Sequence, residues 1–116
     1  MTRVHSVAVV LPAYNEEQRI GHVLAQLLAR RWSVSVGIIV IDDGSSDRTA
    51  EIVQGYGDRV TLLRHQTNRG LGLTFQQAVE YCLEHQFDSL VFFDADGQFD
   101  PEEIEKLLVK QVKRSV

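Results

Sequence analysis

Apolar runs and stretches of helical periodicity alternate along the chain. Residues 7–11, 36–41 and 90–93 are largely apolar runs, which are typical of strands buried on both faces of a sheet. Residues 59–64 form a further predicted strand. Between these strands apolar residues recur at helical spacing, which predicts amphipathic helices. Their apolar positions are Ile20, Val23, Leu24, Leu27 and Leu28; Ile52, Val53 and Tyr56; Phe75, Ala78, Val79, Cys82 and Leu83; and Ile104, Leu107, Leu108 and Val112. The alternation predicts an α/β fold with a doubly wound, mostly parallel sheet.

The connections limit the order of these strands. Right-handed crossovers leave few arrangements, and the simplest is third, second, first, fourth. This order places a switch point between the first and fourth strands, and ligands of open α/β sheets bind at the carboxyl ends of strands beside such a switch. Polar clusters at residues 12–17, 42–47 and 94–98 each follow a predicted strand. We therefore expect a ligand site at this end of the sheet.

Length and charge narrow the class of protein. At 116 residues the chain has room for one domain. Its formal net charge of −4 gives no electrostatic reason to expect a nucleic-acid partner. The longest apolar run near the N-terminus, residues 7–11, is too short for a signal-peptide core or a membrane span. A cytoplasmic location is the expectation.

Cysteine and histidine give no sign of a disulfide or of a histidine-based metal site. Cys82 is the only cysteine, so an intrachain disulfide is impossible and a reducing compartment fits. Its apolar neighbours predict a packed small hydrophobe rather than a nucleophile. The histidines are scattered without metal-ligand spacing, and we expect each of them to lie at the surface. They are His5, His22, His65 and His85.

The acid pair Asp94 and Asp96 is the first candidate for chemistry. Two carboxylates two residues apart, directly after an apolar strand, project to a similar place if the chain stays extended. Mg²⁺ and Mn²⁺ take such oxygen ligands and share their shell with substrate phosphates. A metal held there would neutralise a diphosphate leaving group. The alternative is a solvated aspartate turn without a ligand.

The other polar clusters suit a nucleotide. Asp43 follows the second strand and could accept hydrogen bonds from a base or from ribose hydroxyls; alternatively, it and Ser45 only shape a turn. Tyr14 offers a ring that can stack on a base, and the helix start at residues 16–17 suits an anion. Arg69 belongs to residues 68–72, which are predicted to open a helix. The glycines of this segment allow the backbone to approach a ligand closely, and the Arg69 side chain could contact a phosphate. A flexible helix start is the alternative for that segment.

Together these clusters carry a resemblance. The ordered motifs are LPAYNEE at 11–17, IDDGSSDRT at 41–49, NRGLG at 68–72 and DADGQ at 94–98. In this order they resemble the N-terminal half of family 2 glycosyltransferases, which have the GT-A fold. The chain is most similar to the polyprenyl-phosphate mannosyl- and glucosyltransferases, and the resemblance covers nearly the whole sequence. It implies a Rossmann-like, three-layer α/β/α architecture.

The resemblance also implies roles for single residues. It assigns Asp94, Asp96 and Gln98 to a site for Mg²⁺ or Mn²⁺ that also meets the diphosphate. It implies that the remaining matched positions contact the nucleotide: Pro12, Ala13, Tyr14, Glu16, Asp43, Arg69 and Ala95.

The activity that the resemblance implies is transfer of a sugar from a UDP- or GDP-linked donor to an acceptor, such as a polyprenyl phosphate, with inversion. Residues 1–116 then form the donor-binding half, because the family's acceptor-binding residues and any catalytic base follow this stretch. Such an acceptor would bring the protein to the cytoplasmic face of a membrane. The apolar edge at residues 90–93 would be unpaired, so we expect a second copy or a partner chain to cover it.

Three other classes share parts of this pattern. A haloacid-dehalogenase-type phosphatase also has an apolar strand followed by Asp-x-Asp-Gly, with its first Asp as nucleophile, but few residues follow Asp96 here. A receiver domain has a similar length, but its acidic pair follows the first strand. A nucleotide-binding fragment without activity differs from an enzyme only in lacking the acceptor half.

Overall fold

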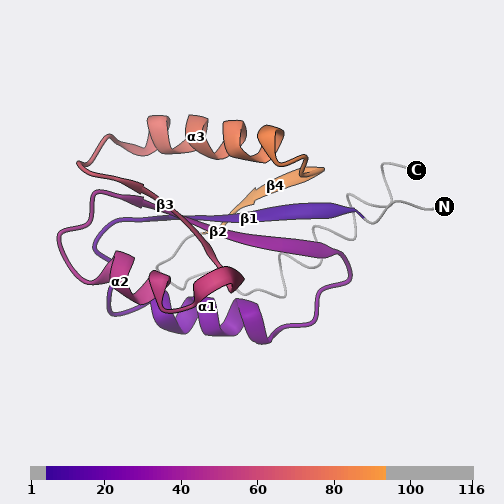
Figure 1. The fold of residues 1–116 in the computed structure, drawn as a ribbon, viewed down its shortest axis with the longest axis horizontal. Helices are drawn as coiled ribbons and strands as arrows, with labels where there is room; N and C mark the ends of the chain where they lie inside the picture. The colour runs from indigo at the N-terminus through magenta and orange to yellow at the C-terminus, as the bar shows by residue number, and fades with distance from the viewer. Residues whose placement is uncertain (1–4, 94–116) are drawn as a thin grey trace.

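A parallel β-sheet forms the centre of the fold in the computed structural model, which describes residues 5–93 (Figure 1). Its strands are β1 (Ser6–Ala13), β2 (Ser35–Asp43), β3 (Thr61–His65) and β4 (Ser89–Phe92). They lie in the order β3-β2-β1-β4, and each neighbouring pair is parallel. The strand order predicted from the crossover rule is therefore confirmed.

Helices cover both faces of this sheet. Figure 1 shows α1 (Ile20–Ala29) and α2 (Thr49–Gln54) on one side and α3 (Leu71–Glu84) on the other. The three-layer α/β/α architecture is thus confirmed. A short 3-10 turn, η1 (Gly57–Arg59), separates α2 from β3. No helix within residues 5–93 is long and apolar enough to cross a bilayer.

The element boundaries differ from the sequence prediction most clearly between α2 and β3. The helix α2 ends at Gln54, before Tyr56, and β3 begins at Thr61 rather than at residue 59. Both differences have the same cause, because Gly57 has a φ of 60° and residues 57–59 turn as a 3-10 helix between the two elements. The helix predicted around residues 104–112 lies outside the described residues.

The central strands are buried on both faces, as their continuous apolar runs predict. In β1, Val7, Val9 and Leu11 belong to the core under α1 and α2. Ala8 and Val10 alternate with them and belong to the core under α3. Side chains of a strand alternate between the two faces, so each position along a strand is committed to one helical layer. This alternation decides which strand-end residues reach the functional site.

The helix α3 buries a narrower face than the sequence predicts. Its buried residues are Thr74, Ala78 and Cys82, which are spaced four apart. Phe75 and Leu83 were predicted to be buried as well, and this was wrong, because they are 52% and 74% exposed. Small side chains bring α3 close to the sheet, which leaves the larger residues beside the contact line at the surface.

Cys82 behaves as the sequence predicts. It is buried in the core between α3 and the sheet. Burial raises the pKa of its thiol, so the thiol is protonated at neutral pH and has little nucleophilic character.

Candidate functional site

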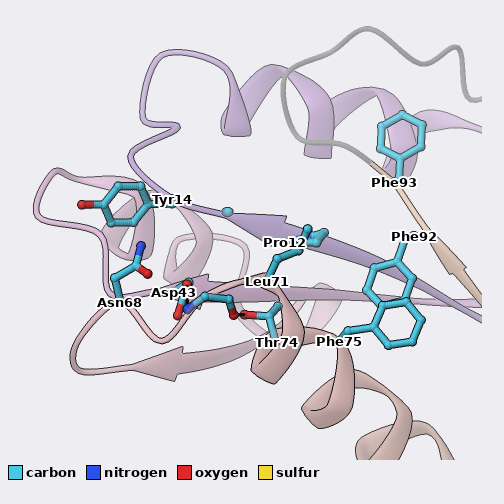
Figure 2. A pocket seen from close by; sticks show the side chains of 11 residues that line it. Pro12, Tyr14, Asp43, Asn68, Leu71, Thr74, Phe75, Phe92 and Phe93 are labelled. Carbon is cyan, nitrogen blue, oxygen red and sulfur yellow. Dashed lines mark hydrogen bonds between the residues drawn. The ribbon is translucent and has the colours of Figure 1, made fainter.

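A cavity of about 600 Å³ opens at the carboxyl end of the sheet, on the side of α3 (Figure 2). This is the end at which the strand order predicts a ligand site. The ends of β1, β2 and β4, the loop before α3 and the first turns of α3 form its walls. The residues that line it are Pro12, Ala13, Tyr14, Asp43, Asn68, Gly70, Leu71, Thr74, Phe75, Phe92 and Phe93.

Most of the predicted nucleotide residues in the described part of the chain meet in this cavity. Pro12, Ala13 and Tyr14 come from the end of β1, and Asp43 ends the neighbouring strand β2. Tyr14 is 48% exposed, so much of its ring is free to contact a ligand. Figure 2 shows Tyr14 at the same end of the cavity as Asp43 and Asn68.

Asp43 is held by the chain itself. Its Oδ1 accepts hydrogen bonds from the backbone N–H of Arg69 and from His65 Nδ1, both at 2.8 Å. Its Oδ2 accepts the N–H of Gly70 at 3.0 Å. Burial raises the pKa of this carboxyl, but the bonds from His65, Arg69 and Gly70 outweigh it and leave the pKa below the ordinary 3.8. Asp43 is therefore ionised at neutral pH and fixes the loop before α3.

His65 is part of this arrangement, and the expectation of a surface histidine was wrong for it. Its side chain is only 10% exposed. It lies opposite Asp43 in the β2–β3 register, and both side chains point to the α3 face. Its Nε2 faces Oε1 of Gln77 on α3. An ionised carboxylate has no proton to donate, so His65 carries a proton on Nδ1 and donates it to Asp43.

The loop before α3 presents its backbone to the site and turns one side chain away. Gly70 lines the cavity with a φ of 92°, a conformation that favours glycine. The side chain of Arg69 lines a different cavity of about 450 Å³, together with His65 and Gln77. Within the described residues, the contribution of Arg69 to the larger cavity is thus its N–H bond to Asp43.

Aromatic side chains form the far end of the cavity. The rings of Phe75 and Phe92 stack with centroids 4.4 Å apart and planes 13° apart, as Figure 2 shows. Leu71, which is 70% exposed, extends this apolar surface. Helical periodicity assigned Phe75 to the core, and no sequence pattern indicated its place in the cavity wall.

The N–H groups around residues 16–17, where the sequence predicts an anion, are bonded within the protein. The N–H groups of Asn15, Glu16 and Glu17 donate to side chains of the loop after β2. The acceptors of these three bonds are Ser45 Oγ, Thr49 Oγ1 and Asp47 Oδ2. These three N–H groups are therefore not free for an anion, and the helix α1 itself begins later, at Ile20. We call these two segments, residues 15–19 and 44–49, the loop clasp.

Glu16 belongs to this clasp rather than to the cavity wall. Its carboxylate lies 3.3 Å from the guanidinium of Arg19. Its backbone oxygen accepts the N–H groups of Arg19 and Ile20 at the start of α1. Asn15 completes the clasp in the opposite direction, because its Oδ1 accepts the N–H of Ser46.

Asp42, next to Asp43, lies on the opposite face of the sheet. Its side chain is completely buried and lies 3.3 Å from Nε of Arg64. Its Oδ1 accepts the N–H of Ser45. The two neighbouring carboxylates of β2 thus lie on opposite faces of the sheet, and of the two only Asp43 lines the cavity.

The proposed metal ligands Asp94, Asp96 and Gln98, with Ala95, lie outside the described residues. Within residues 5–93 no group of histidine, cysteine, aspartate or glutamate side chains could hold a metal ion. The carboxylate of Asp43 already accepts three N–H bonds, two of them on Oδ1, which leaves it little capacity for a metal ion. Phe93 lines the cavity, so the acid pair follows in the chain directly after the cavity wall.

Comparison with known proteins gives a consistent result. The family model described as "Glycosyl transferase family 2" matches residues 8–114. A UDP-N-acetylglucosamine–dolichyl-phosphate N-acetylglucosaminyltransferase of Methanococcus voltae is 30% identical over 88% of this chain and 45% of its own length. The chain spans less than half the length of curated relatives that it matches.

Solved structures agree with this match. Glucosyl-3-phosphoglycerate synthase of Mycobacterium tuberculosis, in complex with Mn²⁺, UDP and its product, is similar with a TM-score of 0.62 and 25% identity, over 78% of this chain and 33% of that one. A mannosyltransferase of Pyrobaculum calidifontis, in complex with GDP-mannose and Mn²⁺, gives a TM-score of 0.59 and 25% identity, over 78% and 27% of the two chains.

Proposed function

The chain belongs to glycosyl transferase family 2, and from this premise we propose that it binds a nucleoside-diphosphate sugar in the cavity at the carboxyl end of the sheet. The observation that carries the proposal is the meeting of Pro12, Tyr14 and Asp43 from two strand ends in one open cavity. Family membership also decides against the phosphatase and receiver-domain alternatives.

The described residues supply a place for the nucleoside. The ring of Tyr14 would stack on the base, which stabilises binding without regard to base identity. Asp43 would accept a hydrogen bond from the base. Pro12 and Ala13 would form the floor beneath the base, because they end β1 and line the same cavity.

The diphosphate would bind towards residues 94–98. We propose that Asp94, Asp96 and Gln98 hold a divalent cation, Mg²⁺ or Mn²⁺, and that Ala95 lies against the nucleotide. A bound cation of this kind supplies Lewis-acid stabilisation of the diphosphate leaving group. The structures of similar proteins with Mn²⁺ and a nucleotide support the type of cofactor.

The acceptor would be a polyprenyl phosphate, attacking the sugar with inversion. The relative from Methanococcus voltae, named as a dolichyl-phosphate N-acetylglucosaminyltransferase, supports this choice. A lipid phosphate is already anionic and needs no general base. Residues 1–116 would act as the donor-binding half, and a polyprenyl acceptor would bring them to the cytoplasmic face of a membrane.

The edge strand β4 (Ser89–Phe92) pairs with β1 and, within the described residues, with no strand on its other side. An apolar strand with an open edge is a template for association. We propose that a second copy of this chain or a partner chain covers it. Light scattering tests this proposal, and a monodisperse monomer at high concentration would count against it.

Calorimetric titration with UDP, GDP and their sugars, with and without Mn²⁺, tests the donor site. We expect nucleoside-diphosphate binding that depends on the metal and that Asp96→Ala weakens severely. Asp58→Ala is the matched control, because Asp58 is an exposed aspartate in η1 that does not line the cavity. Equal affinity with and without metal would remove the proposed role of the acid pair.

A further inference from the structure

The hydrogen bonds around Asp43 limit what this carboxylate can still accept. A carboxylate has two oxygens with about four lone-pair positions in total. Within residues 5–93, the donors that use them are His65 Nδ1, the N–H of Arg69 and the N–H of Gly70. The first two of these bond to Oδ1, which fills that oxygen, and the third uses half of the capacity of Oδ2.

Among the described residues, these bonds leave a single acceptor position, on Oδ2. Asp43 lines the cavity beside Tyr14 and Asn68, so a base stacked on Tyr14 can reach it. From this count we infer that His65 and the amides of Arg69 and Gly70 make Asp43 a single acceptor that selects uracil over guanine. This inference rests on the proposed function, and it names the donor class as uridine diphosphate sugars.

The bases differ in the donors that they present. Uracil has one ring N–H, at N3, between two carbonyl oxygens, so it makes one hydrogen bond to a carboxylate. Guanine presents its N1–H and its N2 amino group side by side, and a free carboxylate binds this pair with one oxygen for each donor. With Oδ1 of Asp43 filled, one guanine donor would stay unpaired, and leaving a buried donor unpaired weakens binding by roughly tenfold or more.

Asn68 supports the same choice. Its side chain lies at the Asp43 end of the cavity in Figure 2. Its amide can donate to a carbonyl oxygen beside the uracil N3–H. Cytosine, by contrast, has a lone pair at N3, which would face the negative carboxylate of Asp43. Tyr14 does not discriminate, because stacking on a ring is open to every base.

Titrating the wild-type 116-residue chain with UDP, GDP, CDP and N3-methyl-UDP in the presence of Mn²⁺ tests the inference without any variant. We expect UDP to bind roughly tenfold or more tightly than each of the others, since each of them lacks the N3–H or carries a second donor. N3-methyl-UDP is the sharpest probe, because it differs from UDP only at the atom that meets Asp43.

The outcomes separate this inference from the proposed function. If GDP or N3-methyl-UDP binds as tightly as UDP, the inference is wrong, while the donor-binding function stands. If none of the nucleotides binds, the donor-binding function fails and the inference fails with it.

His65→Phe tests the part played by the histidine. The variant keeps a planar ring and removes the donor that fills Oδ1, so we expect the preference for UDP over GDP to narrow. Gln77→Leu is the matched control, because it removes the other partner of the imidazole and leaves the Nδ1–H bond to Asp43 in place. An unchanged preference in His65→Phe would overturn the role of His65.

Discussion

The two sides of the sheet at its carboxyl end use their polar groups in opposite ways. On the side of α1 and α2, the loop clasp joins residues 15–19 to residues 44–49, and side chains accept bonds from the N–H groups of residues 15–17. On the side of α3, Tyr14 and Asp43 border an open cavity with part of their bonding capacity unused. The hydrogen bonds of the first side stabilise the fold, whereas Tyr14 and Asp43 on the second side are accessible to a ligand.

This difference shows how adjacent residues acquire separate tasks. Asp42 and Asp43 are neighbours, yet Asp42 is buried beside Arg64 under one layer and Asp43 faces the other. The alternation of side chains along β2 is sufficient to separate them. Substitutions on the two sides should therefore affect different measurements.

Gly44→Ala should disrupt both sides and have the largest effect. Gly44 has a φ of 78°, and a Cβ there would lie 2.5 Å from the backbone of Thr67 and Asn68. We expect the free energy of unfolding to fall by about 3 kcal/mol or more, from the left-handed backbone and the clash together. Urea unfolding measures it.

Gly57→Ala is the matched control for this prediction. Gly57 also has a positive φ, of 60°, but a Cβ there would meet nothing within 4 Å. We expect it to lose only about 1–2 kcal/mol, the cost of the backbone conformation alone. Equal losses in the two variants would mean that the contact of residue 44 with the 67–68 backbone is unimportant.

Thr49→Val should affect the clasp and spare the cavity. Thr49 is fully buried, accepts the N–H of Glu16 and donates to Asp47. Valine has a similar shape but leaves both partners without this bond, so we expect a loss of about 1–3 kcal/mol in unfolding free energy. Nucleotide affinity, measured by calorimetry on the folded variant, should stay unchanged. A large loss of affinity would contradict the separation of the two sides.

Low pH should destabilise the fold through one carboxylate on each side of the sheet, Asp43 on the side of α3 and Asp47 in the loop clasp. The pKa values of Asp43 and Asp47 both lie below 3.8, because hydrogen bonds to the charged carboxylates outweigh the opposing effect of burial. A lowered folded-state pKa gives stability that is present above the unfolded value and is lost as the pH falls through the folded value. The free energy of unfolding should therefore decline as the pH drops below about 4.

Amide variants separate the two contributions. Asp47→Asn should reduce the fall in unfolding free energy at low pH and leave nucleotide binding unchanged. Asp43→Asn should also reduce this fall, but it should weaken nucleotide binding as well. Urea unfolding of each variant at about pH 6 and about pH 3 gives the measurement. An acid decline as steep in both variants as in the wild type would show that other groups cause it.

Phe75→Ala should have the smallest effect on stability. Phe75 is half exposed and its main described contact is the stacked ring of Phe92. We expect a loss of about 0.5–1.5 kcal/mol, the range for an aromatic pair. Leu83→Ala is the control on the same helix, since Leu83 is 74% exposed. A loss in Leu83→Ala equal to that in Phe75→Ala would indicate that the ring pair contributes nothing.

The layers and strand order could be predicted from the sequence because they depend on periodicity. Continuous apolar runs such as residues 7–11 mark strands buried on both faces, and the crossover rule then leaves one simple order. The position of the site followed from that order. Tyr14 and Asp43 could be placed together at the cavity because polar residues gather at strand ends beside a switch point.

His65 and Phe75 could not be predicted in the same way. His65 acquires its role through the register of β3 against β2, which places it opposite Asp43, and no local pattern records that register. Phe75 fits the helical stripe equally well, but the close approach of Thr74 and Ala78 to the sheet leaves it at the cavity. Both depend on tertiary distances that residue spacing does not contain.

The opposite orientations of Asp42 and Asp43 restrict how the length of this region can change during evolution. Deleting one residue within β2 would exchange the faces of all positions that follow, so Asp43 would turn to the layer of α1 and α2, Gly44 would take its place, and the cavity would lose its carboxylate. Length changes of a single residue should therefore be tolerated in the turns around the strand and selected against inside it. Laboratory recombination of such chains should place its crossover points accordingly.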